Sequence, residues 1–419
     1  MAEAEAEEAA VSKIKQSNFK EVRIIINHNV QTKSKKDDDY IDVAKNADYQ
    51  NQSHEYYREF LNWRSSGDNP YAYSFVRRKN EYSYVDGKGY VSNDPGDKEK
   101  KVLKRCCRLI AMTMFTIILF SLAEMFYVSM YYKTFVFSTT KVLYGQSVET
   151  YDVPMSLCLG ICLIRSLKYI IPTLIFILDT RIPGEVFLPK ADKMFPNMTA
   201  CAFVMALMAA SFCRISNDVL AYIAEKIGIG VYRFDYMYSS NPLVTIAFGF
   251  CNCIFLSVLS EVLFRGLILQ TMRQFGDMFA FIICCVTEAF CGFDILGYGS
   301  TICIGIIITL FTLRTGSIKT AIGMRISATT LFFLLDTVGV YLEKNYAMIA
   351  EAGVCLIIIA ISLVIYSRVT LAQNFSFNVN NSKTHLSIAK KLSIFFSHSG
   401  IMLWLIIVLT VALFSLRFV

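Results

Sequence analysis

The stretch SEVLFRG, residues 260–266, places a glutamate and an arginine inside a long apolar run of the chain. A helix needs roughly twenty mostly apolar residues to cross a bilayer, so the segment from about 242 to 269 is predicted to span a membrane. Glu261 and Arg265 are four residues apart, which puts their side chains on one face of that helix. Such a pair either holds neighbouring helices in register or belongs to an active or transport site.

The composition of the whole chain agrees with a membrane protein. Of its 419 residues, 54% are hydrophobic and 18% are charged, and the mean hydropathy is +0.44. A soluble globular protein is therefore excluded. We predict an all-α polytopic bundle of about eight to nine transmembrane helices. The candidate spans lie near 109–131, 154–178, 195–214, 242–269, 278–293, 299–313, 318–341, 347–366 and 399–417.

The first part of the chain differs from the rest. Residues 1–104 are polar and rich in tyrosine, and they carry no secretory signal. We expect this extension to be cytosolic and largely disordered, with one short amphipathic helix at HEYYREFLNWR, residues 54–64. Residues 105–419 then form the transmembrane bundle.

Basic residues gather beside the predicted spans. The net charge is +7, and KEKKVLKRCCR, residues 98–108, directly precedes the first long apolar run. This position favours contact with anionic lipid over binding of nucleic acid. Lysine and arginine in the short loops fall on one side if the spans alternate, which predicts that the N-terminus lies in the cytosol. We expect the protein to reside in the cell membrane. With nine spans the C-terminus lies outside.

The predicted spans contain several charged side chains. Each costs roughly 2.5–3.5 kcal/mol at a helix centre, so we expect these groups to face the bundle interior and to be paired. Glu288 is a candidate partner for Arg165 or Lys168, although its position in the sequence does not decide this. The charged residues are Glu124, Arg165, Lys168, Glu261, Arg265, Glu288, Asp294, Arg325, Asp336 and Glu351.

Three segments together resemble the CPBP family of intramembrane CAAX-processing and bacteriocin-processing proteases. They are SEVLFRGLILQTMRQFG, FAFIICCVTEAFCGFD and GIIITLFTLRTGSIKTAIGMRISATTLFF, within residues of about 240–335. Their order and spacing resemble the family's motifs, which are Glu-Glu-x-x-x-Arg, Phe-x-x-x-His and His-x-x-x-Asn. The resemblance implies a cavity among transmembrane helices in which a glutamate and a histidine activate water. It also implies that a second histidine and an asparagine steady the oxyanion.

Carried over residue by residue, the resemblance shows that the family's reactive positions have changed type. Glu261 and Arg265 match the first motif, but Ser260 replaces its first glutamate. Phe290 matches the second motif, and Asp294 takes the place of its histidine. In the third motif Arg325 and Thr329 replace the histidine and the asparagine. The six candidate site residues are Ser260, Glu261, Arg265, Asp294, Arg325 and Thr329.

These replacements remove the usual chemistry of the site. The four histidines, His28, His54, His385 and His398, lie outside the spans that carry the motifs, so we expect no metal and no cofactor. Ser260 would need a histidine or lysine base to act as a nucleophile. If the fold is kept, Asp294 and Arg325 are predicted to form a buried ion pair across the former cavity.

Three functions remain open from the sequence. One is a catalytically degenerate family member that binds a peptide or a membrane-protein partner within the lipid bilayer. Another is a divergent endopeptidase that uses Glu261 or Asp294 as the base for a water. The third is a transporter, because paired intramembrane charges are also common there.

Overall fold

The computed structural model describes residues 52–67, 69–71, 82–85, 89–92, 95–135, 137–143, 146–191, 196–231, 241–295, 297–342, 344–373, 379, 384–414 and 416–418. All of them belong to one compact unit, Asp42–Val419. The α-helices are α2 (His54–Ser65), α3 (Pro95–Phe135), α4 (Met155–Thr180), α5 (Gly184–Phe187), α6 (Pro196–Lys226), α7 (Pro242–Gly249), α8 (Leu256–Glu261), α9 (Leu269–Met272), α10 (Asp277–Ala289), α11 (Gly297–Thr315), α12 (Ile318–Tyr341), α13 (Lys344–Gln373), α14 (Ile388–Phe396) and α15 (Ser399–Phe414). Two π-helical segments, η1 (Phe250–Phe255) and η2 (Val262–Ile268), and a 3₁₀ turn, η3 (Arg273–Phe275), complete the helices.

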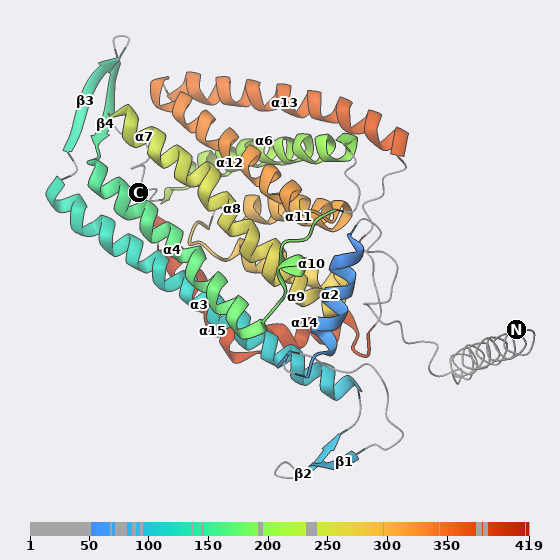
Figure 1. Cartoon of the computed structure of the whole chain (residues 1–419). Coiled ribbons are helices and arrows are strands. Elements are labelled where there is room, and N and C mark those ends of the chain that lie inside the picture. Colours follow the sequence, from blue (N-terminus) through green and yellow to red (C-terminus); the bar gives the residue numbers. More distant parts are fainter. Residues whose placement is uncertain are drawn as a thin grey trace, which may run out of the picture. The chain divides into compact units, whose positions relative to one another are not determined.

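The predicted all-α membrane bundle is confirmed (Figure 1). Within the described ranges, seven helices are long and apolar enough to cross a membrane, and α14 and α15, bent by 66°, make an eighth if they count as one span. The seven are Gly96–Met130, Met155–Thr180, Pro196–Ala224, Pro242–Phe275, Gly297–Thr315, Ile318–Thr337 and Tyr346–Val369. The chain is therefore an integral membrane protein.

The predicted fifth span, 278–293, is shorter than expected. It is helix α10, which has 13 residues and ends at Ala289. At 1.5 Å per residue it extends about 20 Å, whereas the hydrocarbon core of a bilayer is about 30 Å thick. α10 follows Gly276, whose φ of 113° is a conformation that suits glycine. It packs against α11, and the two form a hairpin inside the bundle.

The turns of the bundle gather at two ends. One, which we call the α2 end, holds α2, α5, the α9–α10 and α11–α12 turns, and α14 (Figure 1). There Ile318 N donates to Pro189 O at 3.1 Å, which ties the α11–α12 turn to the segment after α5. α10 and α11 therefore leave from and return to the same end. The opposite end carries the β-hairpin between α3 and α4 and the C-terminal strand.

Short strands, which the sequence did not predict, lie outside the helical core. β1 (Tyr82–Val85) pairs with β2 (Gly89–Ser92), β3 (Phe137–Leu143) with β4 (Gln146–Asp152), and β5 (Ile229–Val231) with β6 (Leu416–Phe418). All three pairs are antiparallel. The β5–β6 pair joins the end of α6 to the strand that follows α15, so α6 and α15 finish at the same end of the bundle.

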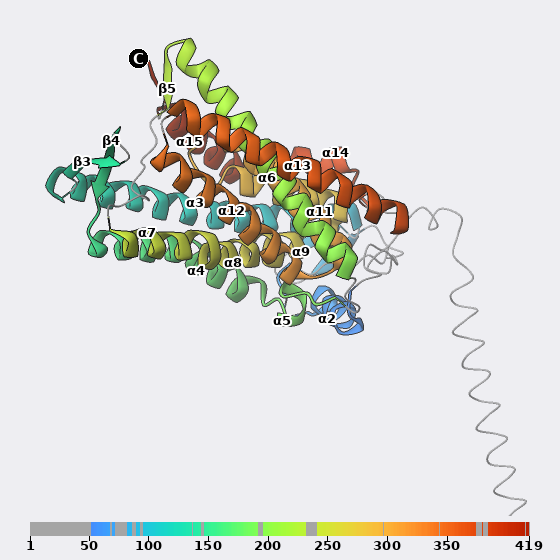
Figure 2. The same ribbon diagram turned by 90° about the horizontal axis from the view of Figure 1, so that it is seen from above.

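Apolar packing divides the bundle into three buried clusters. The largest joins α2, α3, the segment from η2 to α10, and α14–α15. The second joins α6, α11, α12 and α13, and Figure 2 shows α6 and α13 crossing on one side of the bundle. The third joins α3, α4 and α7. The segment Pro242–Phe275 contributes to the first and third clusters, which places SEVLFRG at the centre of the molecule.

The helix predicted at residues 54–64 is confirmed as α2. Ser53 caps it, since its hydroxyl accepts a hydrogen bond from Tyr56 N at 3.2 Å. α3 begins at Pro95, so the domain boundary proposed at residue 104 lies inside a continuous helix. Of the extension that we expect to be largely disordered, residues 1–51, 68, 72–81, 86–88 and 93–94 fall outside the described part of the chain.

Candidate functional site

The predicted pair on the fourth long helix is present. Arg265 Nη1 lies 3.0 Å from Glu261 Oε1, and both side chains are fully buried. Arg265 sits in the π-helical segment η2, directly after α8, which ends at Glu261. A π-helical turn widens the backbone and commonly occurs at functional sites. The helix is therefore irregular at the residues that the sequence singled out.

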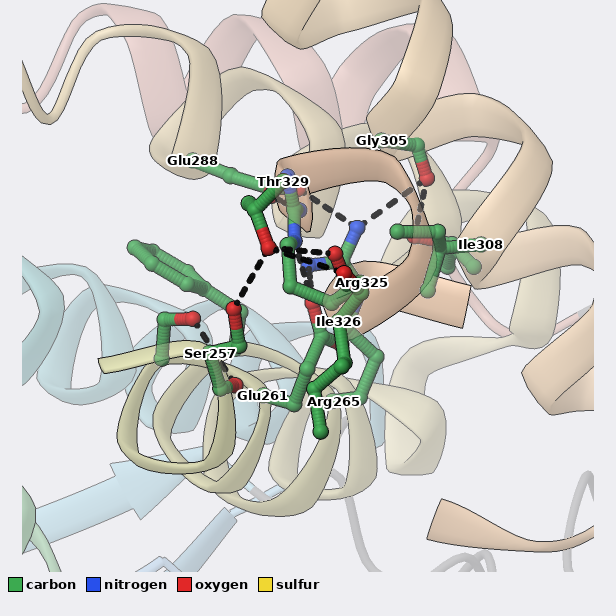
Figure 3. A network of polar contacts seen from close by, with 12 residues as sticks. Ser257, Glu261, Arg265, Glu288, Gly305, Ile308, Arg325, Ile326 and Thr329 are labelled. Carbon is green, nitrogen blue, oxygen red and sulfur yellow. Dashed lines mark hydrogen bonds and ion pairs between the residues drawn. The ribbon is translucent and has the colours of Figure 1, made fainter. Parts of the chain in front are cut away.

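Two more charged residues join this pair from other helices. Arg325 of α12 donates from Nε to Glu261 Oε1 at 2.8 Å, and its Nη2 contacts Glu288 Oε1. Glu288 of α10 pairs with the other arginine, since its Oε2 lies 2.5 Å from Arg265 Nη2. The four side chains close a cycle in which acids and bases alternate (Figure 3). We call Glu261, Arg265, Glu288 and Arg325 the charged ring.

The charged ring has no net charge, which explains why it is tolerated in the membrane. Two carboxylates face two guanidinium groups, and 12% is the largest exposed fraction among the four side chains. Arg265 Nη2 also donates to Gly305 O of α11 at 3.1 Å. A side chain added at Gly305 would place its Cβ 2.8 Å from Glu288 Oε2, so glycine is what lets α11 pass this close. Buried charges of this kind depend on each other, because removing one leaves its partner uncompensated.

Comparison with known proteins bears on this segment of the chain. Residues 242–331 match an Rce1-like family model. Its description is type II CAAX prenyl endopeptidase Rce1-like. The match confirms the resemblance that the three motifs predicted over about 240–335. No curated protein and no solved structure matches the chain.

The Rce1-like segment supplies the whole charged ring. It covers α7 to α11 and the part of α12 that bears Arg325, but less than a quarter of the chain. The four remaining long helices that pack around it, α3, α4, α6 and α13, lie outside the match. The sequence alone therefore connects only the centre of the bundle with the family.

The predicted ion pair between Asp294 and Arg325 is wrong. Arg325 is engaged by Glu261 and Glu288, while Asp294 is exposed in the loop between α10 and α11. α10 ends at Ala289, so a residue five positions later no longer follows the helix into the bundle. Its carboxylate lies against Gly297 at the start of α11. Glu288, in the last turn of α10, is the acid that α10 contributes to the ring.

The expected pairing of Glu288 with Arg165 or Lys168 is also wrong. Arg165 Nη2 lies 2.8 Å from Glu124 Oε1, and Arg165 Nη1 donates to Asn252 at 2.7 Å. Arg214, another half-buried arginine, is likewise paired with acids, on the opposite side of the bundle. There Arg214 lies 2.6 Å from Glu351 Oε2, and Asp218 and Asp336 stand beside it.

The two hydroxyl positions of the motifs lie next to the ring. Thr329 is one helical turn after Arg325, and its hydroxyl donates to Arg325 O at 2.9 Å. It also lies 3.2 Å from Ser257 Oγ (Figure 3). Ser260 donates to Ser257 O at 3.1 Å. Both hydroxyls are thus used by their own helices, and five of the six predicted site residues come together around one centre.

The donor set does not fit a divalent metal ion. A zinc site would need three or four deprotonated ligands around one point. Here both carboxylates face guanidinium groups, whose positive charge opposes a cation at the same place. Among the described side chains, no group of three or more histidine, cysteine, aspartate or glutamate residues is arranged to hold a metal.

Proposed function

We propose that this membrane protein keeps the CPBP-like helical core but does not hydrolyse peptides, and that the bundle serves as a scaffold that binds a peptide or a membrane-protein partner. The observation that carries this proposal is the closed charged ring. Peptide hydrolysis needs a base that can take a proton from water. Glu261 Oε1, which contacts both arginines, already accepts hydrogen bonds from Arg265 and Arg325.

The ring also explains how the family's replaced positions relate to one another. Glu288, and not Asp294, meets residues of the first and third motifs. We therefore assign Glu288 to the position of the second motif's histidine. On this assignment both histidines of the family's site are replaced by charged residues of opposite sign, Glu288 and Arg325. A site that once polarised water would then bind its own side chains.

The oxyanion side of the site supports the same proposal. A hydrolase needs donors aimed at the developing negative charge. Thr329 stands where the family has asparagine, and its hydroxyl already donates to the backbone of its own helix. The arginine guanidinium groups are directed at Glu261 and Glu288. These donors therefore stabilise two resident carboxylates.

The orientation in the membrane belongs to this proposal as well. Exposed basic residues of the described chain mark the α2 end, among them Lys100, Lys104, Arg181 and Lys319. Short loops rich in lysine and arginine remain in the cytosol. We place the α2 end and the N-terminal extension in the cytosol of a cell whose plasma membrane holds the protein. The extension is then the natural arm for a cytosolic partner.

One atom favours a second candidate function, a divergent active endopeptidase. Within the described residues, Glu261 Oε2 is buried and accepts no hydrogen bond. A buried carboxylate oxygen without a donor can hold a water molecule or the N–H group of a peptide. In this alternative Glu261 is the base, and the arginines hold its other oxygen in place.

A cleavage experiment decides between these two functions. The full chain in lipid nanodiscs is incubated with prenylated peptides that end in a CAAX sequence and with matched unprenylated peptides, and fragments are measured by mass spectrometry. The scaffold proposal predicts peptide binding without a protein-dependent fragment. A fragment that disappears in Glu261→Gln but persists in Asp294→Asn would establish the endopeptidase instead. Asp294 is the matched control, because it is an exposed acid outside the ring.

A further inference from the structure

A segment outside the membrane-spanning helices is bound tightly to the α2 end. It comprises residues 52–67 and 69–71, which we call the strap. Three of its aromatic side chains, Tyr56, Phe60 and Trp63, are 0–4% exposed. They stack in sequence, with ring centroids 5.7 Å apart for the first pair and 6.0 Å for the second. Their spacing of four and then three residues puts them on one face of α2.

The strap is anchored at its C-terminal side to the end of α4. Trp63 Nε1 donates to Thr180 O at 2.8 Å, and the hydroxyl of Tyr71 donates to Asp179. Burial, together with the bond to Asp179, raises the pKa of the Tyr71 phenol. At the other side, Gln52 forms an antiparallel bridge with Ala191. The strap is thus fixed at both ends on the bundle.

The side chain of Gln270 connects the strap to the charged ring. Tyr56 donates from its hydroxyl to Gln270 Oε1 at 2.7 Å, and Arg273 Nη1 donates to the same oxygen at 3.1 Å. The amide of Gln270 donates from Nε2 to Arg265 O at 3.1 Å. Arg273 is held in turn by Asp277, at 2.9 Å. All five residues are buried, so these hydrogen bonds are not shared with bulk water.

The hydrogen bond from Gln270 to Arg265 O lies where the helix changes from π-helical to α-helical geometry. Arg265 lies within η2, and the helix returns to α-helical geometry at Leu269, one residue before Gln270. A change of helical register alters which amide each carbonyl can meet, and side chains commonly satisfy the carbonyls at such places. The Gln270 side chain thus binds the carbonyl of the residue whose guanidinium group forms the charged ring.

We propose that the strap positions the charged ring: Tyr56 fixes Gln270, and Gln270 fixes the π-helical turn that carries Arg265. A partner that captures the strap would thereby loosen the turn and the ring. Tyr56 and Gln270 are positioning residues in this account. The proposal holds whether or not the ring performs chemistry, so it is independent of the proposed function.

Hydrogen–deuterium exchange of the full chain in nanodiscs tests the proposal. Tyr56→Phe removes one hydroxyl and keeps the aromatic packing, and it should speed exchange in residues 262–276 about tenfold, the factor for a contact worth about 1.4 kcal/mol. Gln270→Leu should have a similar effect. Because both act on one chain of contacts, the double variant should exchange no faster than the faster single variant. Exchange in α13, which is remote from the strap, should not change.

Phe60→Leu is the matched control, because it reduces packing of the strap and removes no polar contact. It should speed exchange within residues 54–65 and leave residues 262–276 as they are. Unchanged exchange of 262–276 in Tyr56→Phe would overturn the proposal. So would equal effects of Phe60→Leu and Tyr56→Phe on that segment, since burial rather than the hydrogen bonds would then be responsible.

Discussion

Replacing Arg325 with methionine tests whether the four charges act as one unit. The change leaves Glu261 and Glu288 facing only Arg265. Removing one partner of a buried ion pair costs about 3–5 kcal/mol. Since 12% of the Arg325 side chain is exposed, we take the lower end, about 3 kcal/mol. At roughly 2 °C per kcal/mol for a large chain, the midpoint of thermal unfolding should fall by about 6 °C.

The double variant Glu288→Gln/Arg325→Met removes one charge of each sign and leaves the pair of Glu261 and Arg265. It should recover at least half of the loss, because the remaining charges balance. Unfolding can be followed with a thiol-reactive dye, since ten of the thirteen free cysteines are buried in the folded protein. Lys319→Met, an exposed change at the start of α12, is the control and should move the midpoint by about 1 °C or less. A coupled ring would be refuted if the double variant lowered the unfolding midpoint as much as Arg325→Met does, or more.

Two further predictions concern packing and pH. Gly305→Ala should destabilise the protein by about 1–3 kcal/mol in the same thermal assay, because its Cβ would lie 2.8 Å from Glu288 Oε2. Gly299→Ala, on the same helix with no atom within 4 Å, should be neutral or slightly stabilising. Burial raises the pKa of Tyr56 to about 12, so its phenol ionises more readily in the unfolded chain. The stability that it contributes should be complete below pH 10 and lost between about pH 10 and 12, on the order of 2 kcal/mol, and Tyr56→Phe should lack this component of the alkaline unfolding curve.

The sequence predicted the features that depend on local spacing. The apolar runs gave the membrane-spanning helices, and four-residue spacing gave the contact between Glu261 and Arg265 at 3.0 Å. It also gave α2, whose buried aromatics recur on one face. These features follow from helix geometry alone. The motif order likewise brought Arg325 to the same centre.

The partner of Arg325 could not be read from motif spacing, because the spacing was counted from Phe290 and α10 ends before that residue. Counting charge could not find it either, because Asp294 would balance Arg325 as well as Glu288 does. Glu288 also had Arg165 and Lys168 as candidate partners in the sequence. Only the end of α10 at Ala289 decides between the two acids. The relay through Gln270 was beyond the sequence for another reason: it joins residues more than 200 positions apart through uncharged groups.

Infrared spectroscopy tests the central claim, that the buried acids and bases of the Rce1-like segment neutralise one another. The absorption of ionised and of protonated carboxyl groups differs, so glutamate-labelled protein can be compared with Glu261→Gln and Glu288→Gln at neutral pH. Our account predicts that each variant loses ionised-carboxylate absorption and that neither loses a protonated-carboxyl band. Loss of a protonated-carboxyl band in either variant would contradict it, because a neutral acid cannot balance the arginines of the ring.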